Sequence, residues 1–140
     1  MIDVRWGGCK IEHVGIAVKD LKKSNKLFKK LLGQTSYKTE TVESENVTTS
    51  FFKIGEQKIE LLKSTAENSS VSRFLDRRGE GMHHLALHVE DIPKEIQRLE
   101  NEGFSFVSKT PAKGADNKMI VFLHPKTTNG VLIELCQEIK

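Results

Sequence analysis

The sequence predicts an α+β fold built from two copies of one unit, each made of a strand, a helix and further strands. The length of 140 residues suits one ordinary domain spanning 1–140. Hydrophobic residues make up 37% of the chain and charged residues 29%, values typical of a globular protein rather than a disordered one. The most informative observation is internal similarity, because a segment that begins at His13 resembles one that begins at His84.

The first unit covers about residues 9–65 and should open with a strand over His13–Val18, whose side chains alternate between two faces. An amphipathic helix should follow. Asp20 is placed to cap its first turn, and Gly33 to end it in the left-handed conformation. Two later strands carry Phe51-Phe52 and Lys58–Leu62. The apolar stripe expected on the helix consists of Leu21, Leu27, Phe28, Leu31 and Leu32.

The second unit, about residues 81–137, repeats this order. A polar stretch over about 66–80 connects the two units and contains one short expected helix at Val71–Leu75. The elements expected in the second unit are a strand at His84–Val89, a helix between the cap Asp91 and Gly103, and strands at Val121–Leu123 and Leu132–Cys136.

Strand alternation predicts that the two histidines face one concave space. His13 shares its strand face with Gly15 and Ala17, and His84 shares its face with Ala86, so the branched residues of both strands can pack under the helices. Glu60 and Glu134 alternate with apolar neighbours in the later strands. If the halves pair about a pseudo-twofold axis, two imidazoles and two carboxylates converge. Such a set suits a six-coordinate Mn²⁺, Co²⁺, Ni²⁺ or Zn²⁺ ion with two positions left open for catalysis.

A structural role for these residues is the alternative. A single histidine in a strand is more commonly structural, and a glutamate between apolar residues usually faces solvent. The recurrence of both residue types at equivalent places in the two units favours a metal site. The residues alone leave both interpretations open.

Charge and composition exclude several classes of function. Lys and Arg number 22 against 19 Asp and Glu, a net charge of +3, and the basic residues are dispersed. Aromatic residues make up only 6%, which argues against a nucleic-acid partner and is compatible with a phosphorylated or carboxylated small ligand. No apolar run approaches the roughly 20 residues that cross a bilayer, so we expect no membrane partner. Residues 1–6 lack the apolar stretch of a secretory signal, and the two cysteines, Cys9 and Cys136, are too few for a disulfide framework. These features lead us to expect a cytoplasmic protein.

At this point the chain resembles the vicinal oxygen chelate superfamily and, within it, the methylmalonyl-CoA epimerase family. The matching stretches span nearly the whole sequence from Ile11 to Gln137. The most specific are the double histidine in Gly79–Ala86 and the Phe122-Leu123-His124-Pro125-Lys126 segment. The resemblance implies tandem βαβββ units that form a cupped, eight-stranded mixed sheet around a divalent metal ion. It assigns His13, Glu60, His84 and Glu134 as the metal ligands.

The implied activity is the interconversion of (2R)- and (2S)-methylmalonyl-CoA through a metal-stabilised enolate, with Co²⁺ among the candidate metals and propionate metabolism as the setting. Glu134 would be one acid/base group. Thr49 occupies the position where some family members have glutamate, so the second group stays open between Glu43, Glu45, Glu60 and a metal-bound water. Lys113 or Lys118 would lie near the CoA phosphates.

Other expectations concern neighbours and alternatives. By strand parity, His83 should point away from His84. The superfamily often dimerises, so we expect a homodimer, to which the segment around Trp6 could contribute. One alternative function is a glyoxalase I-type lactoylglutathione lyase, which has a similar ligand set. The other is a non-catalytic small-molecule-binding protein, although such modules tend to lack the ligands retained here.

Overall fold

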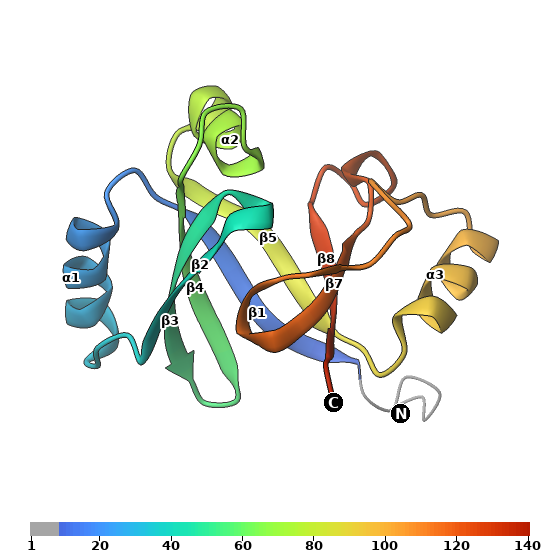
Figure 1. Ribbon diagram of the computed structural model, residues 1–140, viewed down its shortest axis with the longest axis horizontal. Helices are drawn as coiled ribbons and strands as arrows, with labels where there is room; N and C mark the ends of the chain where they lie inside the picture. The colour runs from blue at the N-terminus through green and yellow to red at the C-terminus, as the bar shows by residue number, and fades with distance from the viewer. Residues whose placement is uncertain (1–8) are drawn as a thin grey trace.

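In the computed structural model, which describes residues 9–140, the strands form one curled mixed sheet with helices on opposite sides of the molecule (Figure 1). The first half contains β1 (Lys10–Ala17), α1 (Leu21–Leu32), β2 (Lys38–Val42), the 3-10 turn η2 (Glu43–Glu45), β3 (Val47–Ile54) and β4 (Gln57–Ser64). The connecting helix is α2 (Ser70–Arg78). The second half contains β5 (Gly81–His88), α3 (Ile92–Asn101), β6 (Ala112–Lys113), the turn η3 (Ala115–Asn117), β7 (Lys118–Phe122), the turn η4 (Pro125–Thr127) and β8 (Ile133–Glu138).

The sheet has eight strands in the order β2-β3-β4-β1-β5-β8-β7-β6. The two halves meet where β1 and β5 pair antiparallel at the centre. On either side of this pair, β1 is parallel to β4 and β5 is parallel to β8. The second half thus repeats the strand arrangement of the first in mirrored order. The predicted α+β class and eight-stranded mixed sheet are confirmed.

Helices α1 and α3 cover the outer face of the sheet at opposite sides (Figure 1). Phe28 and Leu32 of α1 pack against Ile16, Phe52 and Leu61, which are residues of the outward strand positions. The equivalent cluster under α3 includes Ile96, Leu99, Leu87, Val121 and Leu135. Burying such apolar side chains is the main force that holds each helix to the sheet.

The sheet covers only part of the apolar stripe predicted for α1. Leu21, Phe28 and Leu32 pack against the sheet. Leu27 and Leu31, by contrast, are 61% and 69% exposed, because they lie on the side of the helix that faces away from the strands.

Both predicted N-caps and the end of α1 at Gly33 are confirmed, whereas the C-cap of α3 is Glu102, one residue before the predicted Gly103, which has φ of 95°. The carboxylate of Asp20 accepts a hydrogen bond from the backbone N–H of Lys23 at 3.0 Å, and Asp91 accepts one from Lys94 at 3.1 Å. A cap of this kind stabilises a helix by about 1 kcal/mol. Gly33 closes α1 with φ of 70°, the left-handed conformation that glycine adopts most readily.

Helix α2 closes one end of the inner face (Figure 1). It extends beyond the predicted Val71–Leu75, and Ser69 caps it by accepting a hydrogen bond from the backbone N–H of Ser72. Val71 packs on Ala17 and Leu62, which point inward from β1 and β4. Trp6, named for a dimer contact, lies outside the described residues. Within residues 9–140, the helices are all too short or too polar to cross a bilayer.

Candidate metal centre

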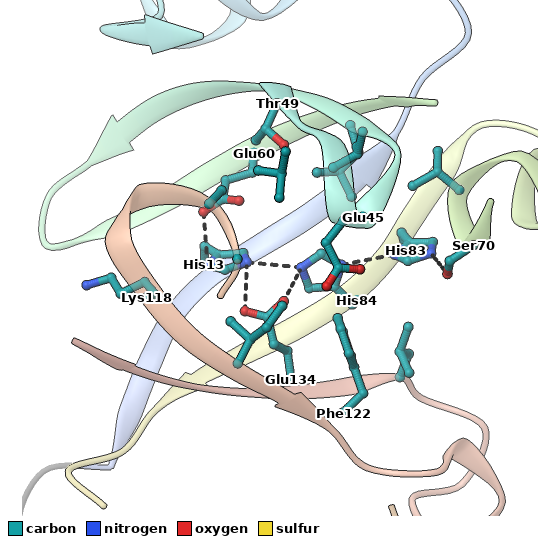
Figure 2. Close-up of a pocket in the computed structure, with 18 of the residues that line it drawn as sticks. His13, Glu45, Thr49, Glu60, Ser70, His83, His84, Lys118, Phe122 and Glu134 are labelled. Atoms are coloured by element: carbon teal, nitrogen blue, oxygen red, sulfur yellow. Dashed lines mark hydrogen bonds and ion pairs between the residues drawn. The ribbon is translucent and has the colours of Figure 1, made fainter. Parts of the chain in front are cut away.

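The inner face of the sheet forms a cavity of about 280 Å³, and all four predicted ligands line it. His13 on β1, Glu60 on β4, His84 on β5 and Glu134 on β8 are each at most 7% exposed (Figure 2). Buried ionisable side chains are costly unless they have partners or hold an ion. Four of them at the bottom of one cavity therefore mark a functional site.

Three of the four residues aim donor atoms at one place. The Nε2 atoms of His13 and His84 are 3.0 Å apart. Glu134 places Oε1 at 3.4 Å from Nε2 of His84 and Oε2 at 3.8 Å from Nε2 of His13. One donor atom from each of the three residues lies within 4.8 Å of the others, as the ligands of one ion must.

Glu60 lies at the other nitrogen of His13. Its Oε2 is 3.0 Å from Nδ1 of His13, on the far side of the ring from His84. The structure therefore brings together three of the predicted ligands and holds Glu60 beside them, in contact with one of the three.

Gly15 makes room for the His84 ring, as expected from the small residues on the histidine face. The two residues are register partners between β1 and β5. A Cβ atom at Gly15 would lie only 2.3 Å from Cε1 and 2.7 Å from Nε2 of His84. The imidazole of His84 thus occupies the space that any other residue at position 15 would fill.

Two β-bulges flank the histidines in the central strand pair. The register passes from Ile11–Leu87 to His13–Ala86, so Glu12 is an extra residue on β1. It passes from Gly15–His84 to Ile16–Met82, so His83 is an extra residue on β5. A bulge breaks the alternation of side chains and redirects the extra residue.

The bulges turn Glu12 and His83 toward the histidines that follow them. Oε1 of Glu12 lies 2.8 Å from Nδ1 of His13, and Nδ1 of His83 lies 3.0 Å from Nδ1 of His84. Nε2 of His83 is in turn 3.0 Å from Oγ of Ser70 on α2. The prediction that His83 points away from His84 is wrong, because strand parity does not hold across a bulge. Partners at both Nδ1 atoms leave both Nε2 atoms to face the cavity.

The electrostatics of the cluster favour a cation. Burial lowers the pKa of His13 and sets that of His84 well below its usual value, so both rings are neutral near pH 7. Burial, together with the charges of Glu12 and Glu45, raises the pKa of Glu134 to about 8. Two neutral imidazole nitrogens and a carboxyl group that ionises when a cation binds are the donor set of a divalent transition metal, and the residues fit such an ion.

Glu12 differs from Glu60 and Glu134 because it forms an ion pair with a lysine. Nζ of Lys58 lies 3.0 Å from Oε2 of Glu12 and 2.6 Å from Oδ2 of Asp116. Burial acts to raise the pKa of Glu12, but hydrogen bonds to His13 and Lys58 outweigh it and lower the pKa to about 2. Glu12 is therefore a permanent anion behind His13, a role that reading the sequence missed. The only signal for it is its position, which precedes His13 as His83 precedes His84.

Cys136 lies near the cluster but is a poor ligand. Glu12, His13 and Cys136 also have donor atoms within 4.8 Å of one another. However, burial raises the pKa of the thiol, and Sγ donates to the carbonyl of Leu87 at 3.5 Å. Since a metal binds the thiolate, the set of His13, His84 and Glu134 is the better site.

A second cavity, about 340 Å³, adjoins the first at α2 and η4. Ser70, Arg73, His83 and Leu132 line both cavities. Its further cationic residues are Arg77, Arg78 and Lys126. This basic groove was not predicted. Of the two lysines proposed for phosphate contacts, Lys118 lines the main cavity, whereas Lys113 lines neither the main cavity nor the groove.

Comparisons with known proteins identify the relatives of this site. The sequence model of the glyoxalase/bleomycin resistance protein/dioxygenase superfamily matches residues 12–122. The uncharacterized protein YqjC of Bacillus subtilis is 35% identical over 128 residues, which cover 91% of this chain and 91% of YqjC. The mitochondrial methylmalonyl-CoA epimerase of Dictyostelium discoideum is 38% identical over 127 residues, which cover 90% of this chain and 76% of that protein. A solved structure of methylmalonyl-CoA epimerase in complex with methylmalonyl-CoA and NH4⁺ has a TM-score of 0.88 at 32% identity, and the match covers 92% of this chain and 94% of that chain.

Proposed function

The chain belongs to the glyoxalase/bleomycin resistance protein/dioxygenase superfamily and, within it, to the methylmalonyl-CoA epimerase family, and from this membership we propose that it interconverts (2R)- and (2S)-methylmalonyl-CoA. The observation that carries the proposal is the buried cluster in which His13, His84 and Glu134 aim donor atoms at one point. A protein that only binds a ligand has no need for such a costly arrangement.

The chemistry asks for stabilisation of negative charge. The carbon between the thioester and the carboxylate loses a proton readily only if the enolate that forms is stabilised. We propose that His13, His84 and Glu134 hold a divalent metal ion, with Glu60 as the fourth ligand once its carboxylate leaves Nδ1 of His13. When bound, the ion supplies Lewis-acid stabilisation of charge on the substrate oxygens.

Other steps, the proton transfer and the orientation of the ligands, fall to residues of the chain. Glu134 takes the proton from C2, so that the C–H bond breaks, an O–H bond forms on the carboxylate, and the electron pair moves toward the thioester carbonyl. Glu12 and His83 hold the rings of His13 and His84 with Nε2 toward the cavity. The ring of Phe122 meets that of His84 edge-on with centroids 5.8 Å apart and forms an apolar wall of the cavity.

The basic groove supports an acyl-CoA as the substrate class. CoA carries several phosphate charges at one end and its thioester at the other. Arg73, Arg77, Arg78 and Lys126 surround the groove, which shares four lining residues with the main cavity. A substrate with its acyl group at the histidines and its phosphates in the groove meets neutral donors at one end and cations at the other.

Deuterium exchange tests this function. Purified protein loaded with Co²⁺ is mixed with methylmalonyl-CoA in D₂O, and loss of the C2 proton signal is followed by NMR. We expect rapid exchange, and none after the ion is removed by a chelator. Glu134→Gln should abolish interconversion of the two epimers while retaining much of the Co²⁺. If the protein shows no exchange with any divalent ion, the proposal fails.

The same preparation distinguishes the epimerase from the glyoxalase I-type alternative. The hemithioacetal of methylglyoxal and glutathione is the substrate of a glyoxalase I-type lyase. Turnover of that compound at an efficiency comparable to epimerisation would favour the lyase. We expect little turnover, because the cations of the basic groove match CoA phosphates and glutathione carries none.

A further inference from the structure

Epimerisation requires two proton-transfer groups. Once C2 has lost its proton, the carbon is planar and a proton must return to the opposite face to invert it. A single carboxyl group, held on one side, returns the proton to the face from which it came. The inference below rests on the proposed function, in which Glu134 serves one face.

Five carboxyl residues line the cavity, and most of them have partners. Glu12 and Asp116 both form ion pairs with Lys58. Glu60 contacts Nδ1 of His13 at 3.0 Å. These contacts hold three of the five away from free exchange of a proton with a substrate. Glu45 and Glu134 are left.

Glu45 reaches into the cavity from the η2 turn. Figure 2 shows its side chain extending toward His84 and Glu134. Within residues 9–140 the carboxyl group of Glu45 makes no hydrogen bond or ion pair. Its oxygens are therefore available to exchange a proton with a substrate. Burial raises the pKa of Glu45, and its charge is among those that raise the pKa of Glu134. The two carboxyls thus lie within electrostatic reach of each other while coming from different halves of the sheet.

The residue at position 49, close to Glu45 in the chain, is not an acid. Thr49 lies on β3, lines the same cavity and is 1% exposed. A threonine hydroxyl does not titrate in the range of a carboxyl and cannot replace one as a proton shuttle. Of the other glutamate on η2, Glu43, the side chain is exposed and does not line the cavity.

We propose that Glu45 is the second acid/base group of the epimerase, acting on the face of the enolate opposite to Glu134. In one direction Glu134 as carboxylate accepts the C2 proton, and Glu45 as carboxylic acid gives its proton to the other face. The product is the opposite epimer, with Glu134 protonated and Glu45 ionised. Exchange of both groups with water restores the starting state, and in the reverse direction their roles change places.

The test compares Glu45→Gln with Glu43→Gln, a matched change on the same turn outside the cavity. Each epimer of methylmalonyl-CoA is incubated separately with Co²⁺-loaded protein in D₂O. Interconversion is followed by a chiral assay and C2 exchange by NMR. Glu45→Gln should lower interconversion by about 10²–10⁴-fold and restrict exchange to one epimer, since only Glu134 still transfers protons. Glu43→Gln should match the wild-type protein in both assays.

A binding measurement separates a catalytic role from a structural one. Titration with Co²⁺, followed by visible absorption, should give the same affinity and spectrum for Glu45→Gln as for wild type. Glu45→Asp, which keeps the carboxyl group, should restore part of the interconversion. The assignment is overturned if Glu45→Gln interconverts the epimers at the wild-type rate, or loses exchange of both epimers together with Co²⁺ affinity. A wild-type protein inactive on both epimers would overturn the proposed function itself.

Discussion

A methyl group added at Gly15 should weaken metal binding without replacing any of the proposed ligands. Gly15→Ala puts a Cβ atom 2.3 Å from Cε1, 2.6 Å from Nδ1 and 2.7 Å from Nε2 of His84. Ordinary contacts of a Cβ atom begin at 3.4 Å, so the imidazole has to retreat by about 1 Å. The backbone of β1 cannot yield instead, because it is paired on both sides, with β4 and β5.

A displacement of this size is large for a metal ligand. A site must be held to within about 0.5 Å of its working geometry, and disturbing the orientation of a ligand typically costs about 10–100-fold in metal affinity. Moving the ring also strains the contact of Nδ1 with His83. We therefore expect Gly15→Ala to bind Co²⁺ about 10–100-fold more weakly than wild type.

Gly81→Ala is the matched control. Gly81 also lies in the central strand pair, opposite Ala17, but a Cβ atom there meets no atom of residues 9–140 within 4 Å. Calorimetric titration with Co²⁺ gives the affinities, and circular dichroism with a thermal melt checks that both variants fold. If Gly15→Ala binds Co²⁺ as tightly as Gly81→Ala, the close approach of Gly15 to His84 does not govern the site.

Two further predictions concern the same cluster. Glu12→Gln keeps an oxygen that accepts from the N–H of His13 but removes the negative charge that makes His13 a stronger metal ligand. Co²⁺ affinity, measured by calorimetry, should therefore fall by about 10-fold. An unchanged affinity would show that the charge of Glu12 does not act on the site. Because the pKa of Glu134 is raised to about 8, its carboxyl carries a proton below that pH and must lose it to bind a cation. Affinity for Co²⁺ should therefore increase between pH 6 and pH 8, by up to about tenfold per unit, with proton release detected in buffers of different ionisation enthalpy; a flat profile would contradict the raised pKa.

Periodicity and repetition in the sequence were sufficient to predict the architecture. The similarity of the segments at His13 and His84 implied two equivalent halves, and alternation placed both histidines on the face opposite the helices. Asp20 and Asp91 marked helix starts because a cap depends on local chemistry alone. Burial of Glu60 and Glu134 on the same face followed from the same period of two.

Features that depend on register could not be predicted. An extra residue in one strand cannot be recognised until its partner strand is known, so the turn of Glu12 and His83 toward the site could not be predicted. The exact place of Glu60, at Nδ1 of His13 rather than beside His84, depends on side-chain rotamers of four strands at once.

Features of the surface could not be predicted from the sequence either. The basic groove combines Arg73, Arg77 and Arg78 of α2 with Lys126 of η4, which are far apart in the chain. The exposure of Leu27 and Leu31 depends on how much of α1 the sheet covers. The homodimer, the cytoplasmic location and the identity of the metal stay predictions.

Because the site spans the central strand pair, ion binding there affects the stability of the whole molecule. His13 and Glu60 come from one side of the β1–β5 seam, and His84 and Glu134 from the other. A cation held by residues of both sides acts as a reversible cross-link between the duplicated halves, and it tightens the fold by as much as the folded state binds it better than the unfolded chain. Loosening the seam and releasing the ion are then coupled, so a substitution far from the cavity that weakens the seam would also weaken the hold on the ion.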